Sequence, residues 1–105
     1  MTYGLRILPA ADDDVDAAAL FLAQDSLETA LRFCDAVAAT FVRIREHPFA
    51  YMRYPLEHPR LGEIRKCAVE EFAFQLVFYR VEDDMVEIIR VLHAARDLPE
   101  VLRDI

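Results

Sequence analysis

The order of apolar and polar residues changes period along the chain, and each period predicts an element. Residues 3–8 alternate, with an apolar residue at every second position from Tyr3 to Ile7, and Pro9 ends the run, as is typical of a short first or edge strand. The acidic run 12–14 follows, and its carboxylates are suited to cap and stabilise the start of a helix. We therefore expect a strand followed at once by a helix.

A second, longer helix is predicted from a capping sequence and an apolar stripe. Asp25 supplies a side-chain acceptor and Glu28 follows three residues later, which is the pattern of a capping box. Pro48 ends the helix near Glu46 or His47. Apolar residues recur between these limits at helical spacing. They are Leu27, Ala30, Leu31, Cys34, Val37, Ala38, Phe41 and Ile44. We expect the two helices to form a hairpin.

The second half of the chain has strand-like periods. Residues 62–69, 72–81 and 85–93 are rich in β-branched and aromatic residues, and the acidic residues 82–84 separate the last two segments. Apolar residues occur on both faces of 72–81, which predicts a central strand. Tyr79 within it is expected to pack in the core with its hydroxyl hydrogen-bonded. Three adjacent strands with short connections favour an antiparallel meander.

The remaining segments complete a single α+β domain over residues 1–105. Residues 47–61 contain three prolines and several aromatic residues, which indicates an ordered connection. Asp97 and Glu100 mark the start of a last short helix. A chain of 105 residues supports one core. We expect the helical hairpin to cover the apolar face of the meander.

Composition narrows the class of protein. Hydrophobic residues make up 55% of the chain and charged residues 30%, which suits a compact soluble domain. No apolar run reaches the roughly 18 residues that a membrane helix needs, and the N-terminus lacks the order of a secretory signal. We therefore expect a cytoplasmic protein without membrane contact.

Charge and cysteine content exclude several kinds of site. The formal net charge of −7 disfavours direct nucleic-acid binding, because phosphate contacts need clustered positive charge. Cys34 and Cys67 are far apart and lack a metal-binding spacing, so both are expected to be buried thiols. His47 and His58 also lack such spacing and are assigned no role. We expect neither a metal site nor a cofactor.

The most specific pattern in the chain begins at Phe78. It reads Phe78-Tyr79-Arg80-Val81, then the acidic turn 82–84, then a valine- and isoleucine-rich segment ending in Leu92-His93 and Arg96-Asp97. This order resembles the C-terminal signature of the RelE/ParE superfamily of type II toxin–antitoxin toxins, and the order of elements resembles that superfamily over nearly the whole chain.

The resemblance implies a growth-inhibiting toxin that a cognate antitoxin neutralises in a hetero-oligomer. ParE-like members are associated with inhibition of DNA gyrase, whereas RelE-like members cleave messenger RNA on the ribosome. Asp97-Leu98-Pro99 stands where many RelE-like toxins carry a tyrosine, and Lys66 is the only lysine. These departures, together with the acidity, favour the ParE-like branch, which acts through protein contact without catalytic residues of its own.

Five residues are candidates for contact with the target or the antitoxin. They are Arg65, Arg80, Arg90, His93 and Arg96. In the RelE-like alternative, all of these except Arg96 would be catalytic, because cleavage by 2′-hydroxyl attack needs cations beside the phosphate and groups that move protons. We expect Arg80, Arg90 and His93 to lie near one exposed edge of the sheet, with Arg65 on the preceding strand extending this cluster across the same sheet. As structural alternatives, the strand arginines would pair with acids such as Glu87 or Asp97, and His93 would pack at the strand end.

A third interpretation belongs to a different class. The acidity of the chain and Glu70-Glu71 before the central strand suggest a non-toxic module that keeps the fold and the antitoxin-binding surface. Harmless expression with stable complex formation would distinguish this module from both toxin branches.

Overall fold

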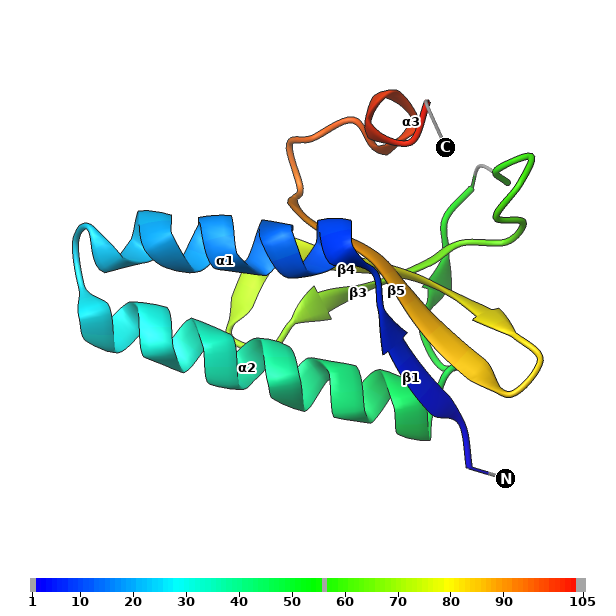
Figure 1. Ribbon diagram of the computed structural model, residues 1–105, viewed down its shortest axis with the longest axis horizontal. Helices are drawn as coiled ribbons and strands as arrows, with labels where there is room; N and C mark the ends of the chain where they lie inside the picture. The colour runs from blue at the N-terminus through cyan, green and yellow to red at the C-terminus, as the bar shows by residue number, and fades with distance from the viewer. Residues whose placement is uncertain (1, 56, 104–105) are drawn as a thin grey trace.

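The computed structural model describes residues 2–55 and 57–103 and has the predicted α+β architecture (Figure 1). The elements follow in the order β1 (Gly4–Ile7), α1 (Pro9–Ala23), α2 (Leu27–Glu46), β2 (Met52–Arg53), β3 (Arg65–Val69), β4 (Phe72–Glu82), β5 (Met85–His93) and α3 (Leu98–Val101). The meander of β3, β4 and β5 and the last short helix confirm the predictions for the C-terminal half.

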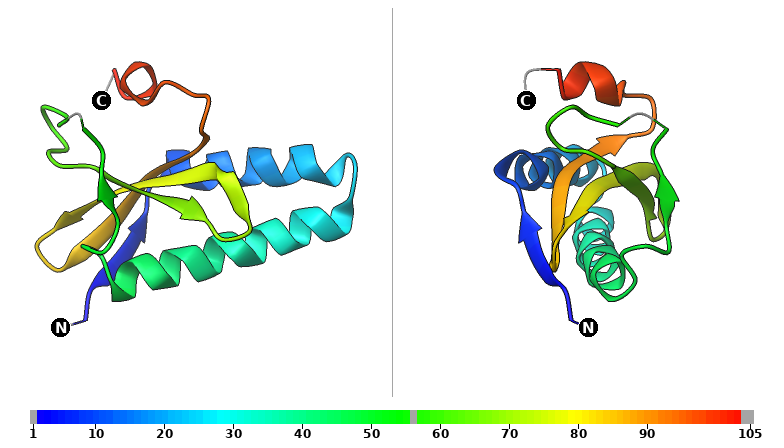
Figure 2. Two further views of the ribbon diagram at one scale, coloured as in Figure 1. Left: turned by 180° about the vertical axis from the view of Figure 1, so that it is seen from behind. Right: turned by 90° about the vertical axis from the view of Figure 1, so that its right-hand side faces the viewer.

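The strands form one mixed sheet in the order β1-β5-β4-β3-β2. β1 pairs in parallel with β5, and the other neighbours are antiparallel. β4 is therefore the central strand, and β1 lies at an edge, as expected. α1 and α2 lie side by side across one face of the sheet, and α3 lies apart from them (Figures 1 and 2).

Both predicted helix starts are wrong in position. α1 begins at Pro9 with Leu8 as its N-cap and no side-chain cap, because the fixed φ of proline suits the first helical position. The acidic run therefore lies inside the helix. α2 is capped by Ser26, whose hydroxyl accepts a hydrogen bond from the Thr29 amide at 3.1 Å. Asp25 is thus outside the helix that it was predicted to cap.

The predicted stripe on α2 is correct only in part. Ala30, Val37, Phe41 and Ile44 are buried, as expected, but so is Phe33, which is not in the predicted stripe. The stripe members Leu27, Leu31, Cys34 and Ala38 are exposed. Two apolar stripes run along this helix, and only the one that faces the sheet enters the core. The prediction of a buried Cys34 is therefore wrong, whereas Cys67 is buried.

Two hydrophobic cores lie on opposite faces of the sheet. The first packs α1 and α2 on the sheet through residues such as Phe33, Val77 and Tyr79. Each large side chain buried in this way contributes about 1.5–3 kcal/mol. The second core lies under α3 and includes Ile64 and Leu98. We call the sheet surface that carries this second core the open face, because the helical hairpin does not cover it.

Tyr79 joins the first core to the connection after α2. Its side chain is fully buried, and its hydroxyl donates a 2.7 Å hydrogen bond to the carbonyl of Pro48. This confirms the prediction of a core tyrosine with a bonded hydroxyl. Burial raises the pKa of Tyr79 well above its usual value, so the ring stays neutral.

Candidate functional site

Arg80 lies on the open face in a row of alternating charges. The register places Arg6 and Arg80 on either side of Glu87. Glu87 accepts from Arg80 Nε at 2.8 Å and from Arg6 Nη1 at 3.2 Å, and Arg80 Nη2 donates to Glu82 at 2.7 Å. The side chain of Glu87 is only 8% exposed. The row holds two positive and two negative groups, so the charge of Arg80 is balanced within the chain.

Arg90 is held by an acid from α1. A register shift in the β4–β5 ladder leaves Ile89 as an extra residue beside Arg90, which locally bends such a strand. Asp14 accepts from Arg90 Nε at 2.7 Å and from Nη2 at 2.8 Å, and it also accepts from the Val91 amide at 3.0 Å. The hydrogen bonds that Arg90 donates to Asp14 raise the pKa of Arg90. Arg90 thus pairs with Asp14 instead of the expected Glu87 or Asp97.

Arg65 lies on the other side of the sheet. Its register partner is Tyr79, which points into the first core. The guanidinium donates to the carbonyl of Tyr51 at 2.8 Å, pairs with Glu63 at 2.8 Å and lies 5.3 Å from the centre of the Phe49 ring. Arg65 therefore anchors the segment that follows α2. The expectation that it extends the Arg80 cluster across one surface is wrong, because the two side chains point to opposite faces.

His93 and Arg96 lie at the far end of β5. Glu87, the partner of Arg80, is six positions from His93, which corresponds to roughly 20 Å along a strand. His93 is exposed and stacks on Phe74, with ring centroids 6.1 Å apart and planes at 13°. Its Nδ1 accepts from the Ala95 amide at 3.1 Å. The candidates that were expected to gather at one edge thus occupy separate surroundings.

Aromatic residues extend this end of β5 into a larger exposed surface. Phe74 is 72% exposed and Phe21 on α1 is 69% exposed. Phe21, His93 and Arg96 border a hollow of about 480 Å³. Next to it lies a hollow of about 370 Å³ bordered by Phe74, and the two hollows share Leu22. We call the surface formed by Phe21, Phe74, His93 and Arg96 the β5-end patch.

This patch was not predicted from the order of apolar and polar residues. Phe74 lies two and four positions before Leu76 and Phe78, which are half-buried and buried, and Phe21 lies within an apolar stretch of α1. Exposure of these rings depends on where the helix and the strand end relative to one another. A hydrophobic pattern does not contain that information.

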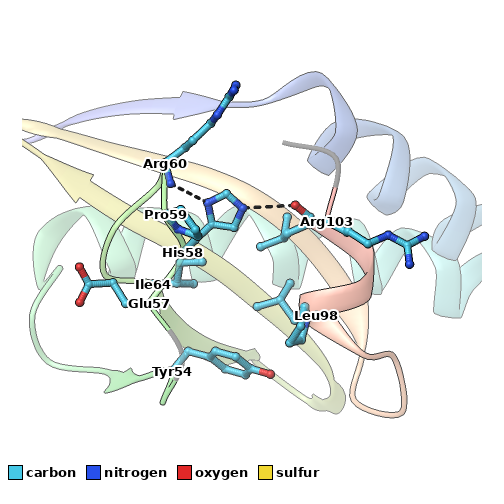
Figure 3. Close-up of a pocket in the computed structure, with 10 residues that line it drawn as sticks. Tyr54, Glu57, His58, Pro59, Arg60, Ile64, Leu98 and Arg103 are labelled. Carbon is cyan, nitrogen blue, oxygen red and sulfur yellow. Dashed lines mark hydrogen bonds between the residues drawn. The ribbon is translucent and has the colours of Figure 1, made fainter.

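A separate cavity of about 400 Å³ lies between α3 and the connection before β3 (Figure 3). Its walls include Tyr54, Ile64 and Leu98. His58 closes one side, since its Nδ1 accepts from the amides of Arg60 and Leu61 and its Nε2 is 3.2 Å from the carbonyl of Leu102. His58, which was assigned no role, therefore ties the connection to the C-terminal helix.

Several kinds of chemistry find no support in this geometry. Within residues 2–55 and 57–103, no group of three or more histidine, cysteine or acidic side chains is placed to hold a metal ion. Over the same residues, no helix has the length and apolar character needed to span a lipid bilayer. Arg65, Arg80 and Arg90 are each bonded to an acid of the chain. The three strand arginines are therefore all engaged in ion pairs within the chain.

Comparison with known proteins identifies the family of the chain. The family model for the ParE toxin of type II toxin-antitoxin system, parDE, matches residues 5–98. A solved structure described as the chromosomal ParDE TA system from P. aeruginosa shares the fold, with a TM-score of 0.70 and 18% identity over 88% of this chain and 96% of that chain. No curated protein matches the sequence. Since the family model spans most of the chain, this protein belongs to the ParE toxin family of type II toxin–antitoxin systems.

Proposed function

We propose that this protein is a toxin that inhibits DNA gyrase through protein contact when it is free. A cognate antitoxin neutralises it by forming a hetero-oligomer. Family membership over residues 5–98 supports the toxin assignment. We favour a gyrase-type mechanism over RNA cleavage because the candidate arginines are paired with acidic residues of the chain.

RNA cleavage requires cations that are free to meet a phosphate. Arg90 is committed to both oxygens of Asp14, and its side chain is only 19% exposed. Arg80 has the same 19% exposure and bonds Glu82 and Glu87. Presenting either guanidinium to a phosphate would break bonds to a partly buried acid and leave that acid unpaired, which is costly. The overall charge of −7 would also oppose approach to RNA.

The β5-end patch is the better candidate for contact with the target. Exposed aromatic rings beside an arginine are the side chains that most often dominate protein interfaces. Phe74 and Phe21 are the rings and Arg96 is the arginine, and Arg96 makes no ion pair with residues 2–55 or 57–103. We therefore assign the target contact to Arg96 and His93 with these two rings. Arg65, Arg80 and Arg90 are instead assigned to stabilising the fold, because each is bonded to an acidic residue of the chain.

The test combines a purified assay with expression in cells. Free protein is added to DNA gyrase, and ATP-dependent supercoiling of relaxed plasmid is measured. Expression with and without the adjacent antitoxin gene is followed by growth, DNA-damage induction and transcript integrity. We expect inhibition of supercoiling and DNA damage, and both should disappear when the antitoxin is present.

A patch variant and a matched control locate the contact. The double variant Phe74→Ser and Arg96→Ala should lose at least tenfold in inhibition, because truncation of an interface anchor typically costs more than 1 kcal/mol. Arg60→Ala removes another exposed arginine, whose side chain points away from the cavity in Figure 3, and should leave inhibition unchanged. Ribosome-dependent transcript cleavage in place of DNA damage would transfer the protein to the endoribonuclease class. Harmless expression with a stable antitoxin complex would identify a non-toxic binding module.

A further inference from the structure

The ring of His58 joins the connection before β3 to the end of α3 through both of its nitrogens. Nδ1 lies 3.0 Å from the amide nitrogen of Arg60 and 3.2 Å from that of Leu61, so it accepts two hydrogen bonds. An imidazole nitrogen that accepts carries no proton, and the neutral ring then has its proton on Nε2. Nε2 therefore donates to the carbonyl of Leu102 at 3.2 Å (Figure 3). We call these three hydrogen bonds the His58 latch.

The turn that contains His58 fixes the orientation of the ring. His58 N donates to Gly62 O at 3.0 Å, and Gly62 N donates to His58 O at 2.8 Å. Gly62 has a φ of 71°, which glycine adopts without steric cost. Within this closed turn, the amides of Arg60 and Leu61 both meet Nδ1. The ring orientation that lets Nε2 reach the Leu102 carbonyl therefore depends on the two bonds at Nδ1.

The short helix at the other end of the latch covers part of the open face. Leu98 and Leu102 are each 2% exposed and pack with Ile64 in the second core. α3 has only four residues, and a helix this short is not stable by itself in water. Its hydrogen bond from Leu102 N to Leu98 O should therefore persist only while α3 is docked. Protection of the α3 amides thus reports whether α3 lies on the sheet.

The surroundings of the ring favour its neutral form. All three hydrogen bonds of the latch are made with backbone groups. The side chains of Glu57, Arg60 and Arg103 extend away from the ring in Figure 3, and Arg103 pairs with Glu100 at 3.0 Å. The titratable and charged side chains that border the cavity with His58 are Tyr54, Glu57, Arg60 and Arg103. Two backbone N–H groups, and no side chain of this set, thus determine whether Nδ1 can hold a proton.

We infer that the His58 latch is sensitive to pH and holds α3 on the open face only while the ring is neutral. A proton on Nδ1 would face two N–H donors, and both accepted hydrogen bonds would be lost. The ring would then turn away from Arg60 and Leu61, which also breaks its bond to Leu102. Protonation therefore favours an open form in which α3 is released and the apolar side chains of the second core are uncovered. The inference does not depend on the target of the protein.

The direction and size of the effect follow from the linkage of one proton to the latch. An imidazole in water takes up a proton with a pKa of about 6.5, whereas the closed latch leaves no room for a proton on Nδ1. The latch is therefore at full strength above about pH 7.5, and it weakens by up to about tenfold per pH unit below about pH 6. Between about pH 7.5 and about pH 5.5, the ratio of closed to open form should fall about tenfold.

Hydrogen–deuterium exchange of the full-length free protein measures this ratio. Exchange is followed by mass spectrometry at the two pH values and expressed as protection factors, which removes the intrinsic pH dependence of amide exchange. We expect protection over residues 97–103 to fall about tenfold. Protection over β4 should stay unchanged, because the first core remains packed. Proton–nitrogen correlation spectra of the imidazole rings should show the proton of His58 on Nε2 at the higher pH.

Substitutions separate His58 from the other two histidines. His58→Asn keeps a side-chain oxygen that can accept from the following amides but has no group that titrates in this pH range, so α3 should be equally protected at both pH values. His47→Asn is the matched control, because it removes an exposed histidine after α2, and it should keep the wild-type response. His93→Asn should keep that response too, although the His93 ring accepts from the Ala95 amide. Far-ultraviolet circular dichroism checks that each variant is folded.

Several results would overturn the inference. One is wild-type protection over residues 97–103 that changes by less than about twofold between the two pH values. Others are a folded His58→Asn protein that keeps the wild-type response, or a His93→Asn protein that loses it. An equal loss of protection over β4 would show global unfolding in acid instead of release of α3. A His58 ring with its proton on Nδ1 at the higher pH would contradict the latch itself, whether or not the variants fold.

Discussion

Asp14 links α1 to β5, and loss of its carboxylate should destabilise the fold more than any other change in the acidic run. The carboxylate accepts three hydrogen bonds, two from the guanidinium of Arg90 and one from the Val91 amide. The side chains of Asp14 and Arg90 are 13% and 19% exposed. Asp14→Ala therefore leaves a charge and a backbone donor without their partners in a poorly hydrated place.

The size of the effect follows from these exposures. Breaking a buried ion pair by removing one partner costs about 3–5 kcal/mol. Some hydration remains for both groups, so the lower end applies, and we expect a loss of about 3 kcal/mol. A domain of 105 residues has a total stability of about 5–15 kcal/mol. The melting temperature should fall by about 12–24 °C, because each kcal/mol shifts a domain of this size by about 4–8 °C.

Urea unfolding followed by far-ultraviolet circular dichroism measures this loss; the chain contains no tryptophan to serve as a fluorescent probe. Asp13→Ala is the control, since its neighbouring side chain is exposed and should change stability by less than about 0.5 kcal/mol. In a double-mutant cycle with Arg90→Ala, the double variant should lose about 1.5–3 kcal/mol less than the sum of the single variants. Equal effects of Asp14→Ala and Asp13→Ala, or strict additivity with Arg90→Ala, would refute the pairing.

Three further predictions concern single residues. Tyr79→Phe leaves the Pro48 carbonyl unpaired and should lower the unfolding free energy by about 1–3 kcal/mol. Because the pKa of Tyr79 is raised in the folded protein, the contribution of its hydroxyl to stability is complete below about pH 10 and is lost at higher pH. The unfolding free energy of the variant should therefore fall less steeply with alkaline pH than that of the wild type. Glu71→Gly should stabilise the fold by about 0.5–1 kcal/mol in the same urea titration, since Glu71 has a φ of 67°; a loss of stability would contradict this. In native protein at pH 8, a thiol reagent monitored by mass spectrometry should label exposed Cys34 rapidly and Cys67 only on unfolding, because burial raises the pKa of the Cys67 thiol; equal rates would contradict the burial of Cys67.

The elements were predictable because they follow from local period and turn chemistry. Residues 72–81 carry apolar side chains on both faces, and the corresponding strand β4 is central in the sheet. Pro48 ended the predicted second helix near Glu46, which is the last residue of α2. Helix starts were less certain, because Pro9, Asp25 and Ser26 all carry start signals. Which of several nearby residues starts the helix depends on the backbone conformation just before it, and the sequence pattern does not show that conformation.

The contacts between distant segments were not predictable in the same way. Glu87 lies directly across from Arg80 in a hairpin, so its pairing with Arg80 was within reach of the sequence. Asp14 is 76 residues from Arg90, and nothing local relates the two. The same limit applies to α2, where two apolar stripes satisfy helical spacing equally well. The position of the sheet selects the stripe with Phe33 and leaves Leu31 outside.

Only part of the signature that carried the family resemblance, His93 and Arg96, is proposed for contact, and there is a physical reason why Arg80 and Arg90 are not. Arg80 and Arg90 lie in the signature, and both bond acids from other segments, so they hold β5 against its neighbours. A guanidinium bonded in this way gains little by leaving its acid for a partner. Phe74 is exposed, and Arg96 forms no ion pair within the part of the chain that the structure describes, so a partner that covers them gains buried apolar area and a cation contact. A patch variant should therefore lose activity while keeping stability, whereas an Arg90 variant should lose stability first.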